Sequence, residues 1–328
     1  MQKFTKSNKF DSKSDVCFIQ GNVFKKIKEI PAKSIDLIIT SPPYNLNKEY
    51  EEIKAFDIYL EEMEPFMKEI DRVLKKDGAF CLQVGNYVNK GEVFPLDIFF
   101  YHMLKKLNYK LRNRIIWHFN SGLHATRRLS GRYETLMWFT KSDDYHFDLD
   151  NIRIPQLYQG KTNYKKGKDY GKLTGNPKGK NPSDFMDQET YGQFIDEEFS
   201  KKIKSEFDNL IFDFPNVKAM HPEKTSHPCQ FPIELVERCV CAFSKEGNIV
   251  FDPFVGVGST LIGALMNSRK AVGCELNKEY MQEAKKRVKL LETGTLPIRN
   301  RGAEIGKATG KVAEKKFAGN LSKTRLGK

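Results

Sequence analysis

The chain has 328 residues, with 55 Lys and Arg against 42 Asp and Glu, and therefore a net charge of +13. The 24 Phe and 13 Tyr residues supply ample material for a buried core, which excludes a chain that is disordered throughout. No run of 18 apolar residues is present and the N-terminal stretch lacks an apolar segment, so we expect no membrane span and no secretion signal. The six cysteines form no C-x-x-C pair and no zinc spacing, and we expect a reduced, cytoplasmic protein without a bound metal.

The positive charge is concentrated in two segments. Residues 151–183 carry eight basic side chains and one acidic one, and residues 293–328 carry nine basic and two acidic ones. The rest of the chain is nearly neutral. This distribution favours a polyanionic partner, with nucleic acid as the first candidate, although Lys-rich loops and tails also serve solubility alone.

Apolar runs alternate with amphipathic stretches along the chain, except in the polar stretch 141–220. This pattern predicts strands at 16–22, 34–45, 79–85, 109–119, 133–140, 248–254 and 270–276. It predicts helices at 23–30, 56–76, 94–107, 232–243, 259–268 and 278–292. Asp77-Gly78 is expected to close the second helix. The alternation predicts an α/β fold with a mostly parallel sheet and helices on both faces.

A glycine-rich turn joins the predicted strand 248–254 to the helix that follows it. Gly256 and Gly258 let the backbone turn sharply and let a ligand approach it, beside the free N–H groups of a helix N-terminus. Glu275 ends the next strand, where its carboxylate can accept both hydroxyls of a ribose. Leu261 replaces the third glycine of a dinucleotide fingerprint, which disfavours NAD and FAD. A tight turn without a ligand is the alternative.

A second motif, Ser41-Pro42-Pro43-Tyr44, stands at the end of the strand IDLIIT. Its two prolines remove two backbone donors and fix φ, so the carbonyls of Ser41 and Pro42 point in set directions. These acceptors and the Ser41 hydroxyl can hold an amino group, while Tyr44 offers a face on which a planar ring can stack. A plain loop is the alternative here.

Together, the two motifs resemble those of the DNA amino-methyltransferases that use S-adenosylmethionine. In that family a [D/N/S]-P-P-[Y/F] motif is catalytic and an F-x-G-x-G motif binds the cofactor. Here S-P-P-Y precedes F-V-G-V-G, an order typical of the β class, which is a circular permutation of the Rossmann-like methyltransferase fold. The resemblance implies a catalytic half at 1–145, a target-recognition insert at 146–220, a cofactor-binding half at 221–292 and a basic tail at 293–328.

The resemblance also implies the residues of the site. Ser41 and the Pro42 carbonyl would accept hydrogen bonds from the target amino group, Pro43 would shape the turn, and Tyr44 would stack on a base that has left the duplex. The segment His227-Pro228-Cys229-Gln230-Phe231-Pro232 resembles the family's segment beside the methionine end of the cofactor. The implied cofactor-binding residues are Asn22, His227, Gln230, Phe231, Asp252, Phe254, Gly256, Gly258, Thr260 and Glu275.

Several of these residues have other interpretations. Asn22 stands where the family usually has Asp, so a carboxylate contact to the adenine of the cofactor is lost. His227 could instead cap the following helix. Asp252 could anchor the glycine turn rather than take the cofactor's ammonium group, and Phe254 could belong to the core.

Double-stranded DNA is the substrate that the resemblance implies, with a restriction endonuclease and a second copy of the chain as further partners it allows. The expected DNA-binding residues are Arg127, Arg128, Arg132, Lys161, Lys165, Lys166, Lys168, Lys172, Lys178 and Lys180. The alternatives are a solvated hairpin tip for the arginines and a disordered loop for the lysines. The tail 293–328 is either an arm on the DNA backbone or a soluble terminus.

The implied reaction is direct methyl transfer to an exocyclic amino nitrogen, without a covalent enzyme intermediate. S-P-P-Y occurs mostly in the family's cytosine-N4 enzymes, so we favour cytosine-N4 over adenine-N6. The remaining alternatives are methylation of RNA or of a protein glutamine, a non-catalytic DNA-binding module and, last, a nucleotide-dependent oxidoreductase.

Overall fold

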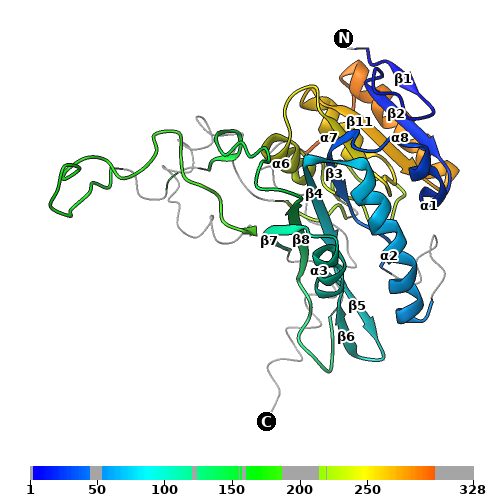
Figure 1. The fold of residues 1–328 in the computed structure, drawn as a ribbon, viewed down its shortest axis with the longest axis horizontal. Helices are drawn as coiled ribbons and strands as arrows, with labels where there is room; N and C mark the ends of the chain where they lie inside the picture. Colours follow the sequence, from blue (N-terminus) through cyan, green and yellow to red (C-terminus); the bar gives the residue numbers. More distant parts are fainter. Residues whose placement is uncertain are drawn as a thin grey trace, which may run out of the picture.

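A nine-stranded sheet forms the centre of the described chain (Figure 1). The computed structural model describes residues 3–44, 54–119, 124–154, 156, 160–186, 214–218 and 220–299. The strand order is β1-β2-β11-β10-β3-β4-β8-β7-β9. The bounds are β1 Lys6–Ser7, β2 Val16–Gln20, β3 Ile35–Thr40, β4 Leu74–Val84, β7 Lys110–His118, β8 Tyr133–Thr140, β9 Phe185–Met186, β10 Ile249–Asp252 and β11 Lys270–Glu275. All pairs from β1 to β4 are parallel, and β8 runs against both of its neighbours, which confirms the predicted mostly parallel sheet.

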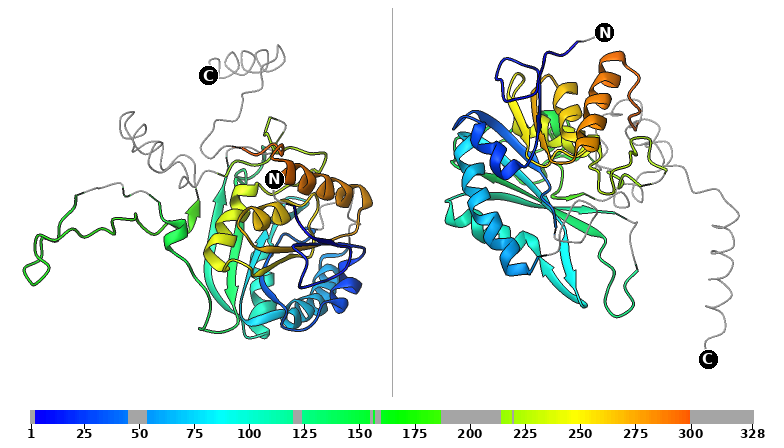
Figure 2. Two further views of the ribbon diagram at one scale, coloured as in Figure 1. Left: turned by 90° about the horizontal axis from the view of Figure 1, so that it is seen from above. Right: turned by 90° about the vertical axis from the view of Figure 1, so that its right-hand side faces the viewer.

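Helices cover both faces of this sheet (Figure 2). One face carries α1 Val23–Lys26, η1 Ile27–Glu29, α2 Phe56–Val73 and α3 Leu96–Lys106, and the other carries α6 Ile233–Phe243, α7 Ser259–Met266 and α8 Lys278–Thr293. On β3, Ile35 and Ile38 belong to the first core, whereas Leu37 and Ile39 belong to the second. A strand buried on both faces needs apolar residues at consecutive positions, and Leu37, Ile38 and Ile39 of β3 meet this need.

The strand order reverses between β10 and β3, which are parallel neighbours. From β10 the chain passes through α7 to β11 on one side, and from β3 it passes through α2 to β4 on the other. The two connecting helices lie on opposite faces, and in open α/β sheets the ligand crevice lies outside the carboxyl ends of two such strands. Both motifs singled out in the sequence follow these strand ends.

The expected helix end at Asp77-Gly78 is wrong. Helix α2 ends at Val73, because Leu74 already has extended backbone, with φ −76° and ψ 134°. Strand β4 then runs straight through Asp77 and Gly78. Its pairing with β3 shifts register in this stretch, so the polar pair lies in an irregular part of the strand rather than in a turn.

A short hairpin that the sequence pattern did not predict follows β4. It consists of β5 Asn86–Asn89 and β6 Glu92–Pro95. Lys90 and Gly91 form its tight turn, with φ of 47° and 90°, the left-handed conformation that two-residue hairpin turns need. Phe56 at the start of α2 stacks on Tyr87 of the hairpin, with ring centroids 5.5 Å apart. The hairpin therefore extends the apolar core toward the carboxyl edge of the sheet.

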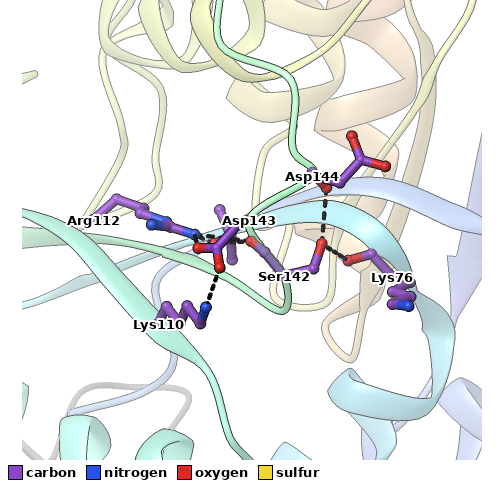
Figure 3. A network of polar contacts seen from close by, with 7 residues as sticks. Lys76, Lys110, Arg112, Ser142, Asp143 and Asp144 are labelled. Carbon is purple, nitrogen blue, oxygen red and sulfur yellow. Dashed lines mark hydrogen bonds and ion pairs between the residues drawn. The ribbon is translucent and has the colours of Figure 1, made fainter.

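The insert leaves the sheet after β8 at a fixed turn. The Arg112 guanidinium donates to Thr140 Oγ1 and to the Ser142 carbonyl at 2.8 Å each, and it pairs with Asp143 at 2.7 Å (Figure 3). Lys110 also pairs with Asp143. Residues 160–180, which we call the arm, extend far from the helices and the sheet (Figure 1). Two isolated antiparallel bridges hold the arm, Ile154 with Lys180 and Thr162 with Leu173, before β9 returns to pair with β7.

The first residues of the predicted basic tail are packed against the body. Leu296 and Ile298 lie against the core beside α6, and Arg299, 6% exposed, pairs with Glu234 at 3.2 Å. The tail beyond Arg299 lies outside the described residues, so the hypothesis that this tail binds the DNA backbone stays a prediction. None of the helices in the described ranges is long and apolar enough to cross a membrane.

Candidate active site

Asp252, the last residue of β10, joins the two motifs of the crevice. Its Oδ1 accepts a hydrogen bond from Thr40 Oγ1 at 2.8 Å, and Thr40 is the last residue of β3. The same carboxylate accepts from Thr260 Oγ1 at 2.6 Å and from the Phe254 N–H at 3.0 Å. The side chain is buried, and burial raises the pKa of Asp252 to about 6 despite these donors. Asp252 and Thr260 thus anchor the glycine turn, which is the alternative to a contact between Asp252 and the cofactor's ammonium group.

The glycine turn is built for a close approach of the backbone. Gly256 and Gly258 have φ of 52° and 84°, in the left-handed region that other residues rarely adopt. A Cβ added at Gly256 would lie 3.2 Å from His227 Nε2, and one added at Gly258 would lie 3.0 Å from the Cβ of Ala284 in α8. A side chain at either position would force its neighbour to shift.

Glu275 stands beside this turn with both carboxylate oxygens held. Oε2 accepts the Gly256 N–H at 2.9 Å and Oε1 accepts the Asn277 N–H at 2.8 Å. Each oxygen of a carboxylate has a second lone pair, so Glu275 can still accept two hydroxyl groups from a ribose. Burial raises the pKa of Glu275 above its usual value, and the two N–H donors oppose that rise.

The His227 segment lies against the glycine turn, and its place beside the methionine end of a cofactor stays a prediction. His227 Nδ1 accepts the Cys229 N–H at 3.2 Å, which leaves the proton of the neutral ring on Nε2, the atom beside Gly256. Burial lowers the pKa of His227 to about 4, so the ring is neutral near pH 7. It packs edge-on against Tyr280 at a centroid distance of 4.6 Å.

Gln230 and Phe231 hold this segment in place. The Gln230 amide accepts from Thr225 Oγ1 and donates to the Glu223 carbonyl, at 2.8 Å each. The Phe231 carbonyl accepts from Ser259 Oγ at 2.9 Å, which ties the segment to the first turn of α7. These contacts are structural, and the contacts of both residues to a cofactor stay predictions.

Asn22 and Phe254 flank the crevice at β2 and β10. Asn22 is exposed and caps α1, since its Oδ1 accepts the Phe24 N–H at 2.9 Å. Phe254 is half-buried and packs against Phe66 of α2, with ring centroids 5.3 Å apart. Both residues have a structural task, and their contacts to a cofactor stay predictions.

Two hydrogen bonds hold the S-P-P-Y turn. Ser41 Oγ donates to the Tyr44 hydroxyl at 2.8 Å, which closes the turn. The Pro43 carbonyl accepts from the Tyr59 hydroxyl of α2 at 2.8 Å. Pro42 is buried, whereas Ser41, Pro43 and Tyr44 are half-exposed. This arrangement places a hydroxyl, a fixed carbonyl and an aromatic face at the rim of the crevice.

Two polar residues behind Tyr44 were not singled out from the sequence. The Tyr44 hydroxyl donates to Gln83 Oε1 at 2.8 Å, and Gln83 Nε2 donates to Glu134. Gln83 is only 1% exposed, although it lies in an apolar strand. Gly85 makes room for this group, since a Cβ there would lie 3.1 Å from the Tyr44 ring. The only hint in the sequence was a buried-type strand, AFCLQVG, that contains one amide and ends in glycine.

The predicted arginine cluster lies at the same edge of the sheet as the site. Arg127, Arg128 and Arg132 belong to the loop between β7 and β8, and Tyr133 at the start of β8 follows it directly. Val84 at the carboxyl end of β4 pairs with Thr135 near that start. Arg127 and Arg128 are exposed, and Arg132 contacts the His124 ring at 3.4 Å.

The predicted lysine cluster is not brought to the crevice. Its members stand on the arm, away from the α/β body (Figure 1). Lys172 pairs with Asp169 at 2.9 Å and Lys178 pairs with Asp150 at 2.6 Å. Lys180 is half-buried, and the fully exposed members are Lys161, Lys165, Lys166, Lys168, Lys172 and Lys178.

The arrangement of the two motifs agrees with the comparison to known families. Residues 35–286, more than half of the chain, match the N6/N4 family described as DNA methylase. The chain belongs to this family. The membership confirms the resemblance to S-adenosylmethionine-dependent DNA amino-methyltransferases, and with it the predicted cofactor.

The chain is similar to several known proteins. It is 38% identical over 265 residues to the Type II methyltransferase M.BglII of Bacillus subtilis, covering 80% of this chain and 66% of that protein. The chain thus spans just under two thirds of that relative's length. It is 30% identical over 308 residues to the DNA adenine methyltransferase YhdJ of Escherichia coli (strain K12), covering 88% of this chain and 92% of that one.

Solved structures show the same fold. A protein of Thermus thermophilus, described as a DNA modification methylase and solved with S-adenosyl-L-methionine, is 25% identical, with a TM-score of 0.52 over 85% of this chain and 97% of its own. The PvuII DNA methyltransferase, described as cytosine-N4-specific, has a TM-score of 0.56 over 98% of this chain and 95% of its own. At 17% identity, this second likeness shows the fold alone.

The residues of the crevice fit the cofactor of the family. Glu275 offers two acceptors for a ribose, the glycine turn offers a backbone without side chains, and Phe254 offers an apolar wall. In the described part of the chain, no group of three His, Cys, Asp or Glu side chains is placed to hold a metal ion.

Proposed function

We propose that the chain is a site-specific DNA methyltransferase that methylates the exocyclic amino group of cytosine at N4. The hydrogen bond between Thr40 and Asp252 carries this proposal, because it places the S-P-P-Y turn directly beside the glycine turn. One crevice thus offers acceptors for an amino group on the β3 side and a nucleotide site on the β10 side. Such proximity is what a direct transfer between two bound substrates requires.

The β10 side would hold S-adenosylmethionine, which supplies a methyl group on a sulfonium sulfur when it is bound. Glu275 would accept the ribose hydroxyls, and Asn22 would face the adenine. Gly256 and Gly258 would let the backbone approach the cofactor. His227, Gln230 and Phe231 would border its methionine end, where the neutral His227 ring adds no positive charge next to the sulfonium.

The β3 side would hold the target base. An exocyclic amino nitrogen is a poor nucleophile, because its lone pair is delocalised into the ring. Acceptors at Ser41 Oγ and at the Pro42 carbonyl would bind the two amino hydrogens and so favour a pyramidal nitrogen with a directed lone pair. Tyr44, half-exposed at the rim, would stack on the flipped base.

Serine in the first position of the motif is the reason for preferring cytosine. Adenine-N6 is the second candidate, and a specific observation favours it: the relative that this chain covers at 92% of its length is described as a DNA adenine methyltransferase. The two amino groups are chemically alike, so their difference must come from the shape of the pocket around the ring.

A nucleoside assay tests the proposal. Duplexes with many sequence contexts are methylated with labelled S-adenosylmethionine and digested to nucleosides. We expect N4-methylcytosine. N6-methyladenine as the only product would overturn the choice of base, and label in RNA or protein but not in DNA would overturn the substrate class.

The arm and the arginine loop would hold the duplex. The exposed lysines of the arm can neutralise phosphates, and Tyr164 and Tyr170, 76% and 65% exposed, stand among them. The arginine loop would contact DNA next to the flipped base, because it lies at the edge of the sheet that carries the S-P-P-Y turn. A cognate restriction endonuclease, a homodimer and a cytoplasmic location stay predictions.

A further inference from the structure

A directed chain of hydrogen bonds runs from the S-P-P-Y turn into the sheet. Ser41 donates to the Tyr44 hydroxyl, Tyr44 donates to the Gln83 carbonyl oxygen, and the Gln83 amide nitrogen donates to the Glu134 carboxylate. The first two of these bonds measure 2.8 Å. The residues come from the turn after β3, from β4 and from β8. Pairing of these strands therefore fixes the positions of the hydrogen-bonded side chains relative to one another.

The direction of this chain follows from the group at its inner end. An ionised carboxylate only accepts hydrogen bonds, whereas a hydroxyl both donates and accepts. A side-chain amide donates from its NH₂ group and accepts at its oxygen. Because Glu134 accepts, Gln83 turns its NH₂ toward it and its oxygen toward Tyr44. Tyr44 then donates to that oxygen and accepts from Ser41. The hydrogen of Ser41 is thereby used inside the turn.

The consequence falls on Ser41. With its hydrogen committed to Tyr44, the Ser41 oxygen presents only lone pairs to the crevice. A serine whose hydrogen pointed outward would donate to the target nitrogen and compete for the lone pair that must attack the methyl group. Aspartate at this position would have no such ambiguity, since an ionised carboxylate is always an acceptor.

We propose that Glu134 is a positioning residue that makes Ser41 an acceptor for the target amino group. This inference rests on the proposed function. Glu134 acts through Gln83 and Tyr44 and does not itself touch the substrate. The charge that an aspartate would carry at the rim of the crevice is thus placed two side chains deeper, behind Tyr44.

The surroundings of Glu134 decide when it can act. Among the described residues, the titratable and charged groups that face it are Tyr44 and, from the segment 214–218, Lys218. Burial raises the pKa of Glu134 to about 6, and the bond from Gln83 and the charge of Lys218 oppose that rise. Glu134 is therefore mostly ionised above pH 6. Below pH 6 its protonated form can donate to Gln83, and the direction of the chain is no longer enforced.

Glu134→Gln tests the proposal, since an amide at 134 can donate as well as accept. We expect kcat for methyl transfer to fall by about 10- to 100-fold at pH 7.5, with the Kd for S-adenosylmethionine unchanged. The wild-type kcat should also fall as the pH drops through about 6, and this fall should be shallower in the variant, where Glu134 no longer titrates and Asp252, with a pKa of about 6, still does. Glu61→Gln, at an exposed position of α2, is the matched control and should keep the wild-type profile.

The same substitution in a Ser41→Asp background separates positioning from mere support of the fold. Aspartate needs no direction from Glu134, so Glu134→Gln should cost less than about threefold there. An equal loss in both backgrounds, or a wild-type kcat and pH profile in Glu134→Gln, would overturn the inference. If Ser41→Asp is inactive, the pH profile decides alone. A wild-type protein that methylates no DNA would overturn the proposed function instead, so the two failures are distinguishable.

Discussion

The α/β body and the arm of the insert are built in opposite ways. In the body, charged side chains near the site are buried and tied down: Asp252 is 2% exposed and accepts three hydrogen bonds. On the described part of the arm, most lysines are exposed, and two isolated antiparallel bridges hold the backbone. The body contains the crevice between β10 and β3, whereas the arm extends away from it (Figure 1).

This difference indicates that the two parts do separate work. A crevice that aligns two substrates needs fixed groups, because a small displacement of a reacting atom is enough to slow a transfer. A surface that meets phosphates needs only reachable positive charge. Variants in the body should therefore change cofactor binding and stability, and variants on the arm should change DNA affinity alone.

Asp252→Ala should have the largest effect and defines the body side of the comparison. It leaves Thr40, Thr260 and the Phe254 N–H without their acceptor, so we expect the free energy of unfolding to fall by about 2–4 kcal/mol. We also expect loss of detectable S-adenosylmethionine binding by calorimetry. Asp144→Ala, at an exposed position, is the control. Cofactor binding retained in Asp252→Ala would show that the glycine turn needs no anchor.

A triple substitution on the arm, Lys165→Ala, Lys166→Ala and Lys168→Ala, tests whether the arm binds DNA. We expect DNA affinity to fall about tenfold near physiological salt, and the slope of log K against log salt to decrease by up to about 3. The melting temperature and the cofactor Kd should stay at the wild-type values. The matched control replaces three exposed lysines of α8, Lys278, Lys286 and Lys289. Equal salt slopes for both triple variants would contradict a specific role of the arm.

Gly256→Ala should have the smallest effect and asks how tight the crevice is. Alanine must adopt a φ near 52° there, and its Cβ would lie 3.2 Å from His227 Nε2. We expect cofactor affinity to fall about three- to tenfold, with a loss of about 1 kcal/mol in stability. Gly247→Ala is the control, since Gly247 has φ 78° with nothing within 4 Å of a new Cβ. If both variants weaken the cofactor equally, backbone strain and not the close approach is responsible.

Features that are local in sequence were predictable. The glycine turn and the S-P-P-Y turn follow β10 and β3, and Glu275 ends β11. The apolar runs located all three strands, although the strand predicted at 34–45 runs past Thr40, where β3 ends. The carboxyl ends of parallel strands share one edge, and the structure brings these motifs together there. The strength of the prediction lay in short segments that carry their own turn chemistry.

Features that depend on pairing between distant strands were not predictable. Gln83 and Glu134 meet behind Tyr44 only because β4 pairs with β8 in one register, and neither residue stands in a recognisable turn. Asp77-Gly78 looks like a helix end, but pairing with β3 keeps it in a strand. The sequence of the arm shows no regular alternation of apolar and polar residues, because most of its described residues are exposed and none of its faces packs against a core. Likewise, Arg299 is packed by Glu234, which is far from it in the sequence.

The neighbourhood of β10 and β3 has a consequence for the order of events during synthesis. The ribosome produces β3 early and β10 near the end, yet the two strands pair in the middle of the sheet. A nascent chain that ends before residue 249 therefore exposes one edge of β3 and has no partner for Thr40. A product that ends there would carry the S-P-P-Y turn without β10, the glycine turn and Glu275, so we expect it to bind no S-adenosylmethionine.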